Sequence, residues 1–145
     1  MTIGFVGMMG NAAIIKKLGG YANTKLHGNL AMGGLLVSFC GLYAIYKNKE
    51  NAGKNHFTSS HSKAGLFTII GSLMIGLVGG VFLNPDFGIA KTNKTIRKMH
   101  KLAGRLIIAL GWMTCYFGLA QLTEDIFVIG FYMLPLVLTI PSTLI

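Results

Sequence analysis

Hydrophobic residues form long segments along this chain, separated by short polar connectors. Four segments approach the roughly 20 residues that a helix needs to cross a hydrocarbon core of about 30 Å. They are Leu26–Tyr46, Leu66–Leu83, Leu102–Leu122 and Ile126–Ile145. A fifth segment, Ile3–Ile15, is too short to cross.

This pattern predicts an all-helical integral membrane bundle. It has four full transmembrane helices and a short N-terminal helix, all within one domain over residues 1–145. The helices are expected at residues 2–16, 24–47, 59–84, 95–122 and 125–145.

The composition agrees with a bilayer as the solvent. Of the 145 residues, 52% are hydrophobic and only 12% are charged, a balance that few water-soluble domains have. The first residues lack the features of a secretory signal or a transit peptide, so we expect the N-terminal segment to stay in the mature protein. The net charge of +9 would suggest nucleic acid binding in a soluble protein, but here the lysines lie in connectors. We therefore expect no nucleic acid partner.

The basic residues divide unevenly between the two membrane faces. We define side A as the face where the short helix ends, at Lys16 and Lys17, before the turn at Gly19 and Gly20. Alternating helices then place nine of the 13 lysines and arginines on side A and four on side B. Basic loops usually stay on the cytosolic or matrix side, which predicts that side A faces the cytosol or the mitochondrial matrix. The two membranes that fit are the mitochondrial inner membrane and an endomembrane.

Two histidines are expected at the same depth of the bilayer. His27 and His100 each lie near the beginning of a helix that starts on side A, so parallel helices carry them to equal depth. Two imidazoles facing each other can hold a haem iron from both sides. His61 begins its helix on side B and has no such counterpart. The pattern makes these three histidines the candidate metal ligands.

Small residues follow each candidate ligand at helical spacing. Gly65 and Gly104 come four residues after His61 and His100, and Ala31 comes four after His27. Residues four apart share a helix face, so a flat cofactor could lie against backbone there. The stripe Ala64, Thr68, Ser72, Gly76 and Gly80 would allow close helix packing in lipid. An alternative interpretation is that the glycines only serve packing and that the histidines face interfacial water.

Three further reactive side chains are assigned no role. Cys40 and Cys115 fall inside predicted spans, where thiols usually act as small apolar fillers. His56 lies in a polar connector and is expected to be solvated.

Three stretches resemble the transmembrane cytochrome b561 family, and the likeness covers nearly the whole chain. They are Lys25-Leu26-His27, Asn55-His56-Phe57-Thr58-Ser59-Ser60-His61-Ser62 followed by Ala64-Gly65, and Lys98-Met99-His100-Lys101-Leu102-Ala103-Gly104-Arg105.

The resemblance implies a four-helix core that holds b-type haems and passes electrons across the membrane, typically from cytosolic ascorbate. His27 and His100 match the pair that ligates the haem on the cytosolic side, and His61 matches one ligand of the other haem. Basic residues at side A would attract ascorbate or another small anionic reductant; they are Lys16, Lys17, Lys25, Lys98, Lys101 and Arg105. Positive-inside topology alone would also explain this cluster.

The sequence departs from the family pattern at its beginning. The remaining haem ligand of the family lies at the start of the first core helix, on side B, and the family has an outer helix before it. A helix from residue 16 back to Met1 rises about 22 Å, which is short of the opposite face. We therefore expect one haem b, with a second only if another polypeptide supplies a ligand opposite His61. A partner subunit is also expected to cover the first helix.

Two functions remain open from the sequence. The first is an electron carrier or transmembrane oxidoreductase with haem between His27 and His100. The alternative is an accessory structural subunit of a larger membrane complex, such as a mitochondrial respiratory complex, that retains a degenerate haem core. A transporter has weaker support, because the predicted spans contain no acidic residue.

Overall fold

The computed structural model describes residues 2–144, and for residues 2, 6, 135–136 and 138–144 it describes the backbone only. The described chain is all-helical without strands, which confirms the predicted fold class. Its elements are η1 Thr2–Gly10, α1 Asn11–Lys17, α2 Tyr21–Asn51, α3 Ser60–Leu77, η2 Val78–Phe82, α4 Lys94–Ala120 and α5 Ile126–Leu144. The two η elements are π-helical, and each is continuous with its α neighbour.

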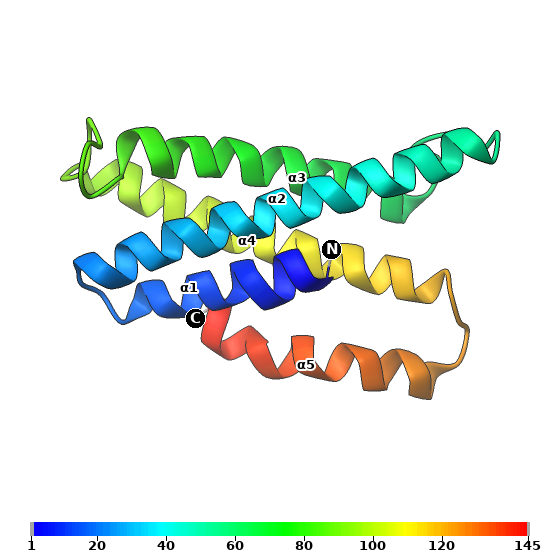
Figure 1. Cartoon of the computed structure of the whole chain (residues 1–145). Coiled ribbons are helices and arrows are strands. Elements are labelled where there is room, and N and C mark those ends of the chain that lie inside the picture. Colours follow the sequence, from blue (N-terminus) through cyan, green and yellow to red (C-terminus); the bar gives the residue numbers. More distant parts are fainter. Residues whose placement is uncertain (1, 145) are drawn as a thin grey trace.

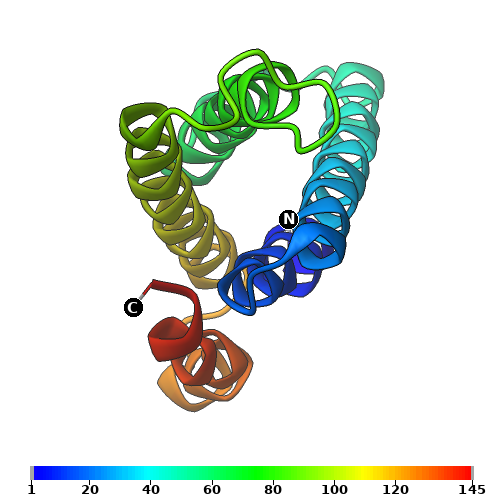
Figure 2. The ribbon, with the colours of Figure 1, turned by 90° about the vertical axis from the view of Figure 1, so that its left-hand side faces the viewer.

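The helices run back and forth along one axis (Figure 1). The turn between α1 and α2 and the loop between η2 and α4 lie together at the left of Figure 1, which is side A. The first helix begins near the middle of the bundle and ends at side A. Viewed from side A, it forms a ring with α2, α3 and α4, and α5 packs outside that ring (Figure 2). The ring is the framework that positions the histidines.

Three of these helices are long and apolar enough to span a membrane: Tyr21–Asn51, Ser60–Phe82 and Lys94–Ala120. Only 17 to 22% of their apolar windows is buried inside the protein, so most of this apolar surface faces outward. Exposure of such a large apolar surface to water is unfavourable, and contact with lipid avoids it. The chain is therefore an integral membrane protein. The predicted fourth span, which corresponds to α5, stays a prediction.

Local sequence explains how the helices begin. Gly19 and Gly20 both have positive φ, which permits the sharp turn that reverses the chain between α1 and α2. Ser59 accepts a hydrogen bond from the Ser62 backbone while Ser62 reaches back, a capping box that starts α3. The side chain of Asn93 caps α4 by accepting hydrogen bonds from the backbone N–H groups of Thr95 and Ile96. These caps fix where His61 and His100 lie on their helices.

Phe5 forms the centre of the bundle. Its side chain is fully buried and packs in a cluster with Met9, Leu35 and Ile69. A Cβ at Gly111 of α4 would lie 2.9 Å from the Phe5 ring, so this glycine lets the ring reach the α4 backbone. The short first helix is thereby held to α2, α3 and α4 at once.

The predicted small-residue stripe packs along only part of α3. Thr68 and Ser72 are buried, but Gly80 is exposed and nothing lies within 4 Å of its Cβ position. The expectation already fails at Gly76 of α3, where nothing lies within 4 Å of the Cβ position, and the wider turns of η2 then rotate Gly80 outward. Gly79 takes the inward position there.

Candidate functional site

The structure brings His27 of α2 and His100 of α4 together at side A. Their ring centroids are 6.3 Å apart and their planes are nearly perpendicular, at 82°. Both side chains are half-buried between the helices. Residues 73 positions apart in the sequence thus form one imidazole pair.

The ring of His27 is oriented by the first helix. Its Nδ1 lies 2.9 Å from the backbone carbonyl oxygen of Ala12, a residue that is almost completely buried. A carbonyl can only accept, so Nδ1 carries the proton and donates it, which leaves the Nε2 lone pair available. Metal-ligating histidines commonly have this arrangement, because the second hydrogen bond fixes both tautomer and ring orientation.

His100 is held by packing instead. The backbone carbonyl of Ile75 lies near its ring, yet Nδ1 is buried with no hydrogen-bond partner among residues 2–144. On its other side the ring lies against Gly79, where an added Cβ would come within 3.0 Å of Cε1. His100 therefore lacks the carbonyl hydrogen bond that orients His27, and its ring position depends on the surrounding helices.

The geometry of the pair fits a metal held by two imidazoles. Two metal–nitrogen bonds of about 2 Å each, plus roughly 1 Å from each nitrogen to its ring centre, separate the centroids by about 6 Å. An edge-to-face ring contact has a similar separation, so the distance alone does not distinguish the two. The described residues contain no group of three or more metal-ligating side chains. A haem needs only two protein ligands, and the pair therefore fits haem better than a bare metal ion.

Positive charge lies beside this pair. Lys16, at the end of α1, is close enough to interact electrostatically with both imidazoles. Partial burial and the charge of Arg97 lower the pKa of Lys16. Arg97 is absent from the basic residues singled out from the sequence, although it lies one helical turn before His100 on α4 and could have been found by that spacing. Lys16 and Arg97 thus bring two positive charges close to the imidazole pair.

The charge of Lys25 is already paired within the folded chain. Its Nζ lies 2.9 Å from Asp86 Oδ2 and 3.2 Å from the Tyr21 hydroxyl. Tyr21 also hydrogen-bonds Asp86, so three side chains attach the loop between η2 and α4 to the beginning of α2. The hydrogen bonds from Tyr21 and Lys25 lower the pKa of Asp86. Asp86 therefore already occupies the anion-binding side of Lys25.

The other basic residues predicted for this site differ in exposure. Lys17, Lys98 and Lys101 are exposed, and Arg105 is half-buried. Exposed lysines can contribute to the potential at this face without contacting a ligand.

His61 lies on α3 toward side B and contacts α4. Its Nδ1 is 2.8 Å from the carbonyl oxygen of Thr114, so Nδ1 donates there and Nε2 keeps its lone pair. A Cβ at Gly118 would come within 2.8 Å of the His61 ring. Among the described residues, none of the aromatic ring contacts involves His61. His61 thus has the orientation of a ligand without an imidazole facing it.

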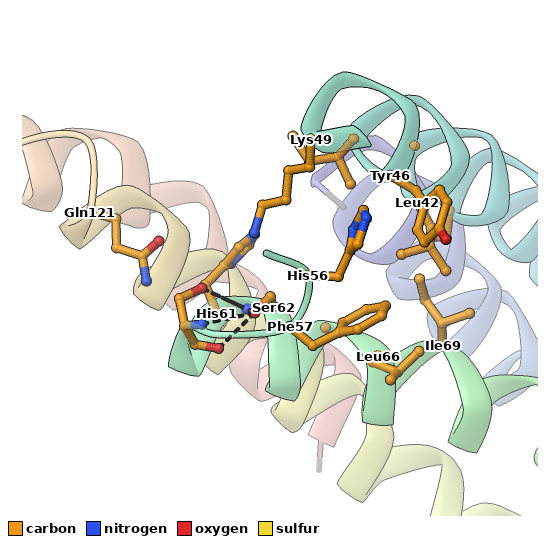
Figure 3. A pocket seen from close by; sticks show the side chains of 15 residues that line it. Leu42, Tyr46, Lys49, His56, Phe57, His61, Ser62, Leu66, Ile69 and Gln121 are labelled. Carbon is orange, nitrogen blue, oxygen red and sulfur yellow. Dashed lines mark hydrogen bonds between the residues drawn. The ribbon is translucent and has the colours of Figure 1, made fainter. Parts of the chain in front are cut away.

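A cavity of about 340 Å³ lies beside His61, within the size range of small-molecule sites. Figure 3 shows His56 next to Tyr46 in this cavity, with Lys49 extending across from α2. The lining is mainly apolar with a few polar groups; it comprises Ser38, Gly41, Leu42, Ile45, Tyr46, Lys49, His56, Phe57, Ser59, His61, Ser62, Gly65, Leu66, Ile69 and Gln121.

The expectation that His56 is solvated is wrong. Its ring stacks on Tyr46 with centroids 4.1 Å apart and planes 13° apart, and the residue is half-buried. The connector folds back over the end of α2, so the aromatic ring shields one face of the imidazole. A polar local sequence does not reveal such a fold-back.

The other predicted residues fall into two groups. Gly65 is buried and lines the side B cavity, whereas Ala31 and Gly104 are half-buried on their helices. Nothing lies within 4 Å of the Cβ position of Gly104. Cys115 packs, partly buried, against the cluster of Ile108 and Trp112. Cys40 is exposed on α2, so it does not fill the interior of the bundle.

Comparison with known families gives one match. A family described as eukaryotic cytochrome b561 matches residues 1–125, which covers all elements except α5. Comparisons with curated proteins and with solved structures found no match.

Proposed function

Because the chain belongs to the eukaryotic cytochrome b561 family, whose members are haem-binding transmembrane electron-transfer proteins, we propose that it binds one haem b between His27 and His100. In this proposal the two imidazoles would hold the haem, which would supply one-electron chemistry with an anionic reductant at side A, and the protein acts as an electron carrier within the membrane.

The facing imidazoles carry the proposal. They come from two different helices, lie 6.3 Å apart at their centroids, and are the two histidines that the sequence places at one depth. A supporting feature is the available Nε2 of His27, which the hydrogen bond from Nδ1 to the Ala12 carbonyl leaves free. A pair serving only as a ring contact would not need this feature.

The residues around the pair would set the properties of the haem. When bound, a haem supplies an iron that changes oxidation state by one electron while two imidazoles remain coordinated. Helices α2 and α4 would hold the ligands, and the Ala12 carbonyl would keep His27 in the ligating tautomer. Partial burial of both rings limits access of water to the metal.

Lys16 and Arg97 are the basic residues that we assign to the anionic group. They lie near the pair and, unlike Lys25, are not ion-paired with Asp86. The carboxylates of a haem and a reductant such as ascorbate share the chemistry that these cations recognise. A variant that lowers the haem content would indicate that the cations bind the carboxylates of the haem. A variant that lowers only the rate of reduction would indicate that they bind the reductant.

The first experiment is the reduced-minus-oxidised absorbance spectrum of the protein purified with its lipid, scaled to the chain concentration. We expect a b-type signal of one haem per chain, and loss of that signal in the variant His27→Ala with the helical circular dichroism retained. A spectrum without haem would contradict the proposal and leave the structural-subunit function. Unchanged haem in His27→Ala would contradict the ligand assignment alone.

A further inference from the structure

Helices α3 and α4 carry the same pair of residues at the same spacing. His61 is followed 18 positions later by Gly79, at the beginning of η2, and His100 is followed 18 positions later by Gly118. Eighteen residues make about five helical turns, so each glycine returns to the face of its histidine roughly 27 Å along the helix. The shared string His-x-x-Ala-Gly at 61–65 and 100–104 extends this correspondence.

Antiparallel packing makes the two pairs reciprocal. The His100 ring of α4 lies against Gly79 of η2, where an added Cβ would be 3.0 Å from Cε1 and 3.7 Å from Nε2. The His61 ring of α3 lies against Gly118 of α4, where an added Cβ would be 2.8 Å from both Cε1 and Nδ1. Each imidazole therefore rests on the bare backbone of the opposite helix.

We propose that Gly79 and Gly118 are positioning residues that set the orientation of the His100 and His61 imidazoles, one near each membrane face. The part that concerns haem rests on the function proposed above. The part that concerns ring orientation holds for the protein with or without haem.

The distances explain why the positions require glycine. Contacts below 3.0 Å from a Cβ are essentially never tolerated, and contacts up to 3.4 Å force the neighbour to move. An imidazole is rigid, so it can give way only by rotating about its side-chain torsions or by displacing its helix. At Gly118 the movement would strain the hydrogen bond of 2.8 Å between His61 Nδ1 and the Thr114 carbonyl.

Two other glycines provide matched controls. Gly80 is the neighbour of Gly79, Gly104 lies on the same helix as Gly118, and nothing lies within 4 Å of either Cβ position. An alanine at a control site changes helix propensity in the same way as at a test site but meets no imidazole. A difference between test and control therefore reports on the ring.

The first test compares Gly79→Ala with Gly80→Ala in the haem-loaded protein. We expect Gly79→Ala to shift the midpoint potential and the low-spin electron paramagnetic resonance signal, because the His100 ring is turned, while Gly80→Ala matches wild type. Equal spectra and potentials in both variants would overturn the His100 part. If no haem binds even to wild type, the function proposed above fails and this part is decided by the second test.

The second test needs no haem. In ¹⁵N-histidine-labelled protein in nanodiscs, His61 should show a protonated Nδ1 and a bare Nε2, and Gly118→Ala should change that pattern while Gly104→Ala should not. In wild type, nuclear Overhauser contacts are expected from the Gly79 Hα to the His100 ring and from the Gly118 Hα to the His61 ring. Absence of these contacts would overturn the proposal even if a variant fails to fold.

Discussion

The two ends of the bundle use similar histidines in different ways. At side A, His27 and His100 approach each other from different helices and share one space. Toward side B, His61 has the same carbonyl anchor on Nδ1 as His27, but it borders a cavity. The hydrogen bond from Nδ1 to a carbonyl orients a single imidazole, whereas a pair also needs a second histidine at the same depth on another helix. A histidine with an available Nε2 thus offers only one of the two ligands that an imidazole pair would provide.

The surroundings of the two ends differ as well. At side A, the first helix supplies the Ala12 carbonyl and the Lys16 charge. Toward side B, the lining comes from α2, the connector with His56, α3, and Gln121 at the end of α4. The cavity therefore contains aromatic and apolar surface with few charges, which suits a flat apolar ligand better than a small anion.

The largest expected effect is on haem content, in a comparison of His100→Ala with His61→Ala. We expect His100→Ala to lose the haem, since the variant removes one of its two proposed protein ligands, and His61→Ala to keep it. The haem-to-chain ratio from absorbance measures both. Equal loss of haem in the two variants would show that His61 also contributes to haem binding. It would contradict the proposed difference between the two ends.

A large effect on stability is expected from Phe5→Ala, because Phe5 joins the first helix to α2, α3 and α4. Removing a fully buried phenylalanine typically costs about 3 to 5 kcal/mol. Thermal unfolding in detergent measures the loss, with Ile3→Ala as a control, since the Ile3 side chain is 72% exposed. We expect haem at side A to weaken too, because the same helix carries the Ala12 carbonyl. A variant as stable as the control would remove Phe5 from its central role.

A smaller effect concerns the charges that distinguish side A. We expect Lys16→Gln to slow reduction by ascorbate by a factor on the order of 10 at low ionic strength, because cations near a redox centre raise the local concentration of an anionic donor. The difference should shrink at high salt. Stopped-flow absorbance measures the rate, and Lys63→Gln, an exposed lysine toward side B, serves as the control. Equal rates in both variants would indicate that the side A lysines only set the orientation in the membrane and do not attract the reductant.

The smallest expected effect is on the loop that Asp86 attaches to α2. The pKa of Asp86 is lower in the folded protein than in the unfolded chain, so its stabilising contribution is present above about pH 4. That contribution is lost as the pH falls through the folded pKa, when the carboxylate is protonated. Melting temperatures of wild type and Asp86→Asn should therefore differ slightly at pH 7 and converge as the pH falls below the pKa of Asp86 in the folded protein. A difference independent of pH would contradict the pairing with Tyr21 and Lys25.

Much of the architecture could be read from the hydrophobic pattern. The lengths of the apolar segments give the helices, and the alternation of sides puts His27 and His100 at one depth. Both depend on local composition and on the fixed rise of a helix. The predicted helix boundaries differ from the structure by a few residues, as at α2, which begins at Tyr21 where residue 24 is predicted. Lys25 was expected in the anionic donor site, and pairing with Asp86 could not be foreseen because the loop position is not local.

The sequence by itself determined the membrane setting, the helical order, the basic face and the depth of each histidine, because these follow from the chemistry of residues near one another in the chain. Only the tertiary structure decided which imidazoles meet, which nitrogen is anchored, and that Gly79 and Gly118 rather than Gly104 contact the rings. These features depend on the rotation of one helix against another. That rotation is set by packing around Phe5 and by the π-helical turn of η2, which no local pattern reveals.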